Sequence, residues 1–164
     1  SLSEHFSAES HPIDIVETLA ETHDWEFDRV GDDQIAMAVE GTWRTYSITL
    51  AWSGNDETLR MIASFEIDPP EDRRAEVHEL LNLVNDACWA GCFTHWAEQA
   101  LMTYRYGLVL AGGQHANTAQ IDTLIATAVA AAERYYPAFQ LVAWGNAAPS
   151  DAVQVAIAEA YGRA

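Results

Sequence analysis

The order of apolar patterns along the chain constrains the fold more than any other feature of the sequence. Between Pro69 and Gly113, an acidic helical pattern (PPEDRRAEVHELLNLVNDACW) is followed by a break at Gly91 and an aromatic hairpin (CFTHWAEQALMTYRYGLVLAGG). A similar unit of one helix and several strands precedes this stretch. Such a repeat of helix followed by strands indicates a small α+β domain.

Four consecutive strands are predicted in the first unit, because apolar and polar residues alternate there with a period of two. These strands cover residues 25–28, 35–39, 44–52 and 59–67. Their short connections favour an antiparallel meander. Since one face of each strand is apolar, the sheet must be covered on that face.

Helical spacing of apolar residues predicts the helices that provide this cover. The first starts after Ser10, and the second runs from Pro70 to Cys88 with Asp68 as its N-cap. Trp89, just beyond the second helix, is expected to be a lid on the core.

The second unit ends with a hairpin and the longest predicted helix. The hairpin strands are expected at residues 93–98 and 101–110. Asn117 and Gln120 are spaced as a capping box that opens the long helix, and Pro137 must kink or end it. A last helix opens at Pro149.

Charge is the outlying property of the composition. The chain has 25 acidic residues against 8 basic ones, which gives a net charge of −17, and every basic residue is arginine. Because an acidic surface repels phosphate backbones, we expect no nucleic-acid partner. A solubilising face explains the charge, and a platform for a basic partner is the alternative.

The sequence also lacks signals for a membrane. No apolar run approaches the ~20 residues that a membrane span needs. The first ten residues have neither the basic nor the apolar region of a signal peptide. We therefore expect a cytoplasmic protein with no membrane partner.

The chain contains no recognisable set of catalytic or metal-binding residues. Its histidines form no pair at metal-ligand spacing, and the absence of lysine excludes Schiff-base chemistry. Cys88 and Cys92 match no zinc or redox pattern well and are expected to be buried, reduced thiols. The sequence therefore predicts no enzyme activity, no metal and no cofactor.

Four segments resemble the YbjN family, a group of bacterial proteins described as sensory transduction regulators. They are WEFDRVGDDQ after the first helix, TYSITLAW, RRAEVHELLNLVNDACWAGCF, and MTYRYGLVLAGG before the long helix. The resemblance extends from about Ile13 to Ala143. It implies a fold like that of type III secretion chaperones, with helices on one side of a twisted antiparallel sheet in the order helix, strands, helix, strands, helix. It also implies a homodimer, and it brings no catalytic residues.

The resemblance suggests a division of the chain into three parts. We expect a flexible segment at residues 1–10, a YbjN-like α+β domain at 11–145 and a packed C-terminal helix at 146–164. The region around Pro137 and this last helix depart from a simple secretion chaperone. They are expected either to cap the sheet or to occupy the surface that a chaperone offers its client.

The leading hypothesis is a non-enzymatic regulatory or chaperone-like protein that binds a polypeptide partner as a homodimer. Trp43, Arg44, Arg60 and Arg105 fall on faces opposite the main apolar rows, so they are the candidate partner-binding residues. A solvated outer face is the alternative explanation for them.

A second hypothesis is a small-molecule-binding domain or an unrecognised hydrolase. Polar aromatic residues are dense in the second hairpin, where His95, Trp96, Tyr104 and Arg105 could line a pocket. A third possibility is a domain that exists only to dimerise.

Overall fold

The computed structural model of the protein describes residues 11–162. The segment 1–10, predicted to be flexible, lies outside the described residues. The helices are α2 (Pro12–His23), the short 3-10 helix η1 (Glu71–Arg73), α3 (Arg74–Asp86), α4 (Thr118–Ala143) and α5 (Pro149–Gly162). The strands are β1 (Glu26–Gly31), β2 (Gln34–Glu40), β3 (Thr45–Ser53), β4 (Thr58–Glu66), β5 (Cys92–Trp96) and β6 (Leu101–Val109).

All six strands form one antiparallel sheet in the order β1-β2-β3-β4-β6-β5. The first four strands are a meander, as the sequence predicts, and β6 pairs with β4 so that β5 is an edge strand. Because alternate residues point to opposite faces, Met37, Ile48, Met61 and Tyr104 share one face, and all four are buried. We call this the inner face and the opposite one the outer face.

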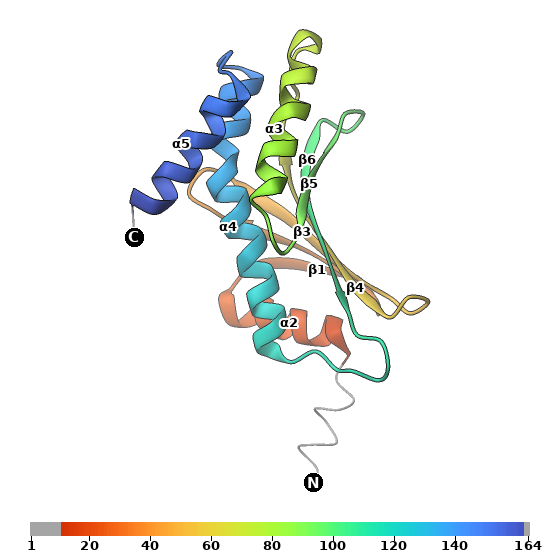
Figure 1. The fold of residues 1–164 in the computed structure, drawn as a ribbon. Helices are drawn as coiled ribbons and strands as arrows, with labels where there is room; N and C mark the ends of the chain where they lie inside the picture. The colour runs from red at the N-terminus through yellow and green to blue at the C-terminus, as the bar shows by residue number, and fades with distance from the viewer. Residues whose placement is uncertain (1–10, 163–164) are drawn as a thin grey trace.

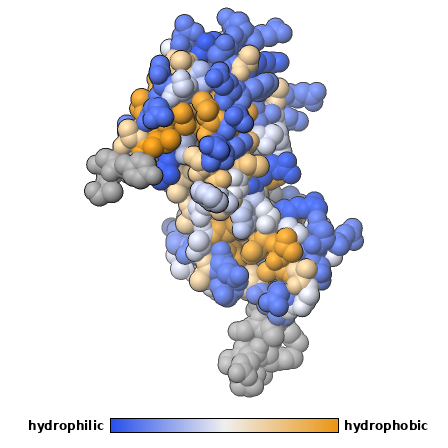
Figure 2. All heavy atoms as spheres, viewed as in Figure 1, coloured by the Kyte–Doolittle hydropathy of each residue, from blue (hydrophilic) through white to orange (hydrophobic). Residues whose placement is uncertain are grey.

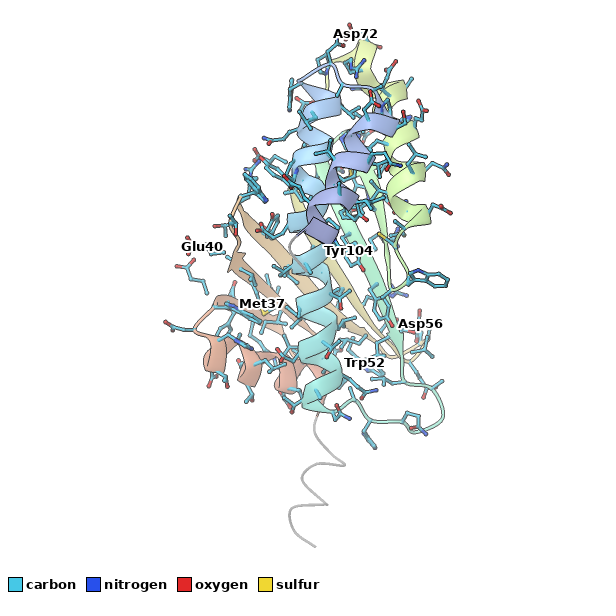
Figure 3. The ribbon with its side chains drawn as sticks, turned by 60° about the vertical axis from the view of Figure 1, so that its left-hand side comes forward. Met37, Glu40, Trp52, Asp56, Asp72 and Tyr104 are labelled. Atoms are coloured by element: carbon cyan, nitrogen blue, oxygen red, sulfur yellow. The ribbon has the colours of Figure 1, made fainter. Side chains whose placement is uncertain are left out.

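Helices α2, α3 and α4 cover the inner face, whereas α5 packs on α3 and α4 (Figure 1). Figure 3 shows the side chains between the two layers, with Met37 and Tyr104 on the inner face of the sheet. Among residues 11–162, no helix covers the outer face (Figure 1). This arrangement confirms the predicted α+β fold, with helices on one side of a twisted antiparallel sheet.

Aromatic packing joins α4 to the half of the sheet that contains β4 and β5. The ring of Phe139 lies 6.2 Å from that of Phe65 on β4 and 5.4 Å from that of Phe93 on β5, measured between ring centroids. All three side chains are buried. Buried aromatic pairs of this kind add to the hydrophobic stabilisation of a core.

One local expectation differs from the structure. The 3-10 turn η1 precedes α3, so Asp68 does not cap that helix. Pro137 lies inside α4 and does not end it, so of the two predicted outcomes the kink stays a prediction. The capping box of Asn117 and Gln120 is present as predicted.

The last helix packs on α3 and α4 rather than on the sheet, so it does not cap the sheet, and its place on a surface for a client stays a prediction. The guanidinium of Arg73 donates hydrogen bonds to the backbone oxygens of Val142 at 2.9 Å and Ala147 at 2.8 Å. These bonds fix the connection between α4 and α5, so that α5 lies against helices and leaves the outer face open. Within residues 11–162, no helix combines the length and the apolar character that crossing a bilayer requires.

Glu133 of α4 holds the β2–β3 turn against the helix. Its carboxylate accepts hydrogen bonds from the backbone N–H of Thr42 at 2.8 Å, from that of Trp43 at 3.3 Å, and from the hydroxyl of Tyr46. A Cβ at Gly41 would lie 2.4 Å from this carboxylate, so the close approach requires glycine. Burial acts to raise the pKa of Glu133, but the hydrogen bonds outweigh it and hold the pKa below its ordinary value.

Replacing Glu133 with alanine is expected to cost about 2 kcal/mol of unfolding free energy at pH 7, because three donors lose a charged acceptor. The pKa of Glu133 is lower in the folded chain than in the unfolded chain. The contribution of Glu133 to the unfolding free energy is therefore complete at a pH above its pKa in the unfolded chain. It is lost as the pH falls through its pKa in the folded chain. Urea unfolding of both proteins across this range should show the difference shrinking towards acid pH.

The control is Glu79→Ala, since Glu79 is exposed on α3. This variant is expected to change the unfolding free energy by less than about 0.5 kcal/mol. An effect of Glu133→Ala that stays constant with pH would contradict the assigned role of its charge.

Candidate functional site

The structure divides the four candidate partner-binding residues between two regions. Arg60 of β4 and Arg105 of β6 lie on the outer face of neighbouring strands. Arg60 is paired with Asp56 at 2.6 Å, and its hydrogen bond holds the pKa of that carboxyl below the ordinary value. Among residues 11–162, Arg105 forms no ion pair. Arg105 therefore offers an uncommitted positive charge on the outer face.

Trp43 and Arg44 lie at the β2–β3 turn, beside the helices. Trp43 is half-exposed and lines a hollow of about 280 Å³ with residues of α4 and α5. The guanidinium of Arg44 lies 5.8 Å from the centroid of the Tyr136 ring and 3.8 Å from the carboxylate of Glu66. These two residues are thus separated from Arg60 and Arg105 rather than joined to them in one surface.

The polar aromatic residues of the second hairpin are divided in the same way. His95 and Tyr104 are on the inner face, and His95 Nε2 lies 2.8 Å from the backbone oxygen of Ile67. Trp96 and Arg105 are on the outer face. Because successive strand residues point to opposite sides, the four cannot line a single pocket. Burial raises the pKa of Tyr104 to about 12.

Trp89, in the connection between α3 and β5, is almost completely exposed. The accessible fraction of this residue is 99%, the largest among the exposed large apolar residues of the described chain. The prediction that Trp89 covers the core is wrong, because the connection turns its side chain away from the buried stripe of α3. The sequence signal that could have revealed this is its position outside the helix, directly before the small residues Ala90 and Gly91.

Hydrogen bonds and a close contact hold the connection that carries Trp89. The side chain of Asn85 accepts a hydrogen bond from Phe93 N–H at 2.7 Å and donates one to Phe93 C=O at 3.0 Å. A Cβ at Gly91 would lie 2.6 Å from the ring of Tyr104, so this position requires glycine. Trp89 is therefore exposed on a connection that is fixed at both ends.

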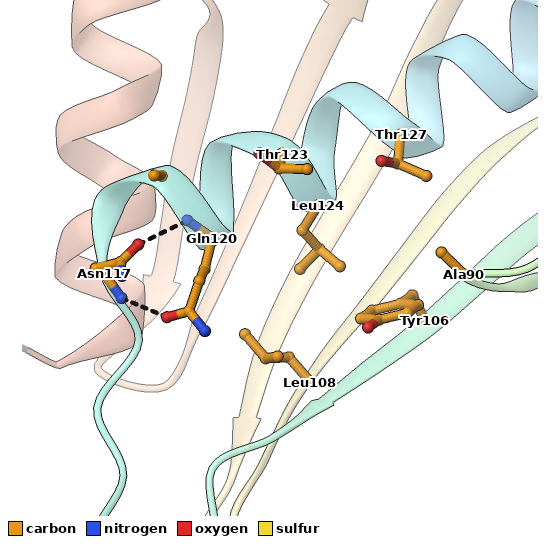
Figure 4. A pocket seen from close by; sticks show the side chains of 9 residues that line it. Ala90, Tyr106, Leu108, Asn117, Gln120, Thr123, Leu124 and Thr127 are labelled. Carbon is orange, nitrogen blue, oxygen red and sulfur yellow. Dashed lines mark hydrogen bonds between the residues drawn. The ribbon is translucent and has the colours of Figure 1, made fainter.

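An apolar groove runs beside α4, next to this connection. Its main part has a volume of about 480 Å³. In Figure 4, Leu124 of α4 faces Tyr106 and Leu108 of β6 across this part of the groove. A second hollow of about 270 Å³ shares Ala90 and Thr127 with the first and continues the groove past Trp89 to Arg134. Figure 2 shows apolar residues gathered over β6 and the first turns of α4.

The lining of the groove differs from the rest of this acidic surface. Among the described residues, no Asp or Glu lines either hollow, although the chain has a net charge of −17. The polar lining consists of hydroxyl and amide groups, and Arg134 is the charged residue at one end. Thr123, Thr127, Ala130 and Arg134 contribute from one side of α4, because they recur at helical spacing. This stripe was visible in the sequence but carried no chemical signature.

The edge of β6 next to the groove is partly unpaired. β5 pairs with β6 only from Leu101 to Arg105, whereas β4 pairs with it as far as Val109. From residue 106 to residue 109, no strand among the described residues pairs with β6 on its β5 side. The groove therefore lies beside backbone groups that can accept another strand.

The two thiols and the metal-ligating side chains of the described residues form no cluster. Cys88 is half-buried, and burial raises the pKa of its thiol. Cys92 is exposed, in contrast to the sequence prediction, because it lies on the outer face at the start of the edge strand. Among residues 11–162, no three His, Cys, Asp or Glu side chains are placed to hold a metal ion.

Comparison with known proteins defines the class of the chain. The sequence profile of the YbjN family, described as "Putative bacterial sensory transduction regulator", matches residues 12–141. The chain therefore belongs to the YbjN family. No curated protein matches it significantly.

The fold is similar to a solved member of that family. The crystal structure of YbjN from E. coli, described as a putative transcription regulator, aligns with a TM-score of 0.53 and 9% sequence identity. The alignment covers 74% of this chain and 85% of that chain. At this level of identity the similarity establishes the fold alone.

Replacing Asn85 with alanine is expected to lower the unfolding free energy by about 1–2 kcal/mol, because both backbone groups of Phe93 lose their side-chain partner. The connection at residues 87–91 should also exchange its amide hydrogens faster. Asn82→Ala is the matched control, since Asn82 is exposed three residues earlier on α3. Equal effects of the two substitutions, measured by urea unfolding and hydrogen exchange, would contradict the role of Asn85.

Proposed function

We propose that this YbjN-family chain is a non-enzymatic regulatory protein that binds a polypeptide partner and acts as a homodimer. The family description as a regulator supports the regulatory part of the proposal. We also propose that the protein has no catalytic activity and that it is cytoplasmic, as expected from the sequence. The observation that carries partner binding is the exposed Trp89 on its fixed connection beside an apolar groove.

Three features of this surface favour a polypeptide. Tryptophan, tyrosine and arginine are the residues that contribute most to protein interfaces, and Trp89, Tyr106 and Arg134 all border the groove. The fixed connection reduces the entropy that binding would otherwise cost. The lack of carboxylates in the lining removes the repulsion that an acidic surface would impose on an apolar or acidic segment.

The hydrolase alternative has less support, because the hairpin residues proposed for it face opposite sides of the sheet. A small apolar ligand is the remaining alternative, since a cavity of about 480 Å³ is within the usual range for ligand sites. A small ligand would not use Trp89, which extends into solvent.

Replacing Trp89 with alanine is expected to leave the melting temperature unchanged, because an exposed side chain contributes little to folding. The same change should abolish capture of the specific partner from native cytosol, measured by quantitative pull-down against the unaltered chain. Val30→Ala is the control, since Val30 is an exposed apolar residue of β1, at the opposite edge of the sheet. Equal recovery of all proteins by the unaltered chain and the Trp89 variant would argue against the proposal.

The homodimer is supported by a second group of exposed apolar side chains, Leu141, Trp144 and Val155, on α4, its C-cap and α5. Figure 2 shows an apolar patch over α5, apart from the groove. Sedimentation of the isolated chain at micromolar concentration should give a dimer, and Val155→Glu should convert it to a monomer. A chain that sediments as a monomer at that concentration would remove the dimer from the proposal.

A further inference from the structure

We infer that the open edge of β6 at residues 106–109 binds an extended segment of the partner as an additional strand. The inference rests on the proposed polypeptide binding and assigns the conformation and the residue pattern of the bound segment. It follows from the unequal lengths of β5 and β6, which leave this edge beside the groove without a strand partner in the described chain.

The backbone of the open edge favours an extended segment over a helix. In an antiparallel sheet, the N–H and C=O of one residue point towards one neighbouring strand, and those of the next residue point towards the other. Half of these groups at residues 106–109 therefore face away from β4. An extended segment placed there pairs its own backbone with them. A helix in the groove would leave them covered by apolar atoms, and an unpaired buried backbone group is costly.

The groove determines which side chains of the added strand face inward. Tyr106 and Leu108 lie on the inner face and line the groove opposite Leu124. Every second residue of an added strand would extend between β6 and α4, into this apolar space. Since no carboxylate of residues 11–162 lines the groove, these inward residues should be apolar.

The intervening residues of the added strand face outward, on the side of Arg105. Arg105 is exposed, it belongs to the outer face, and it forms no ion pair among residues 11–162. It is the last residue of β6 that pairs with β5, so an added strand would begin next to it. An acidic residue at the outward position of the added strand closest to Arg105 would form an ion pair with its guanidinium. The site therefore fits a segment in which apolar and acidic residues alternate.

The opposite edge of the sheet does not offer the same site. β1 carries Glu26 and Asp28 on its outer face and continues into Asp32 and Asp33 at the turn. Charged side chains on an edge strand are a common protection against strand addition. The acidic residues proposed for the bound segment would be repelled by the carboxylates of β1, whereas β6 would not repel them.

A display selection of random ten-residue peptides against the full chain tests the inference. The selected peptides should alternate apolar and acidic residues, and a synthetic representative should slow hydrogen exchange of alternate amides within residues 106–109. Methylating the peptide amides that face β6 should abolish binding, and methylating those on the other edge should not. Arg105→Glu should weaken binding about tenfold, with recovery when the nearest peptide carboxylate is replaced by arginine.

Several results would overturn the inference while leaving the proposed function intact. Selected peptides with a helical spacing of apolar residues would show that the polypeptide binds in another conformation. Slower hydrogen exchange elsewhere in the chain would show that it binds at another place. Protection of residues 106–109 in the free chain would show that a second copy or another segment of this chain already occupies the edge. No selected peptide, together with no loss of captured protein on Trp89→Ala, would contradict the proposed function as well.

Discussion

The packing of α4 across the inner face of the sheet is the contact on which the other features depend. Phe139 joins the helix to Phe65 and Phe93 on separate strands. The same helix positions Glu133 for the β2–β3 turn and supplies one wall of the groove. The apolar alternation of the strands makes this cover necessary, because an inner face of this kind cannot remain in water.

A single helix layer cannot cover the whole inner face, and the candidate site lies where the cover ends. Tyr106 and Leu108 are on the covered face of β6 but remain partly accessible beside α4. The connection from α3 reaches this point with Trp89 directed to solvent. The site is thus formed by a gap in the packing together with a fixed, exposed aromatic residue, and it contains no set of reactive groups.

Much of the fold could be predicted from the sequence because its signals are local. The alternation through Ile48 and its neighbours predicts a strand, and the spacing of Asn117 and Gln120 predicts a helix start that the structure contains. The prediction that Asp68 caps the second helix is wrong, because a 3-10 turn comes between that residue and α3. The membership in the YbjN family was also visible in the sequence, as a pattern of apolar and aromatic residues.

The sequence by itself determined the element types, the α+β class and the acidic character of the chain, since periodicity, capping and charge are properties of neighbouring residues. Only the tertiary structure decided which residues meet. It separated His95 from Trp96 by strand alternation, exposed Trp89, and brought Tyr106 opposite Leu124. It also decided that β6 extends beyond β5, because strand pairing depends on where distant segments end relative to one another.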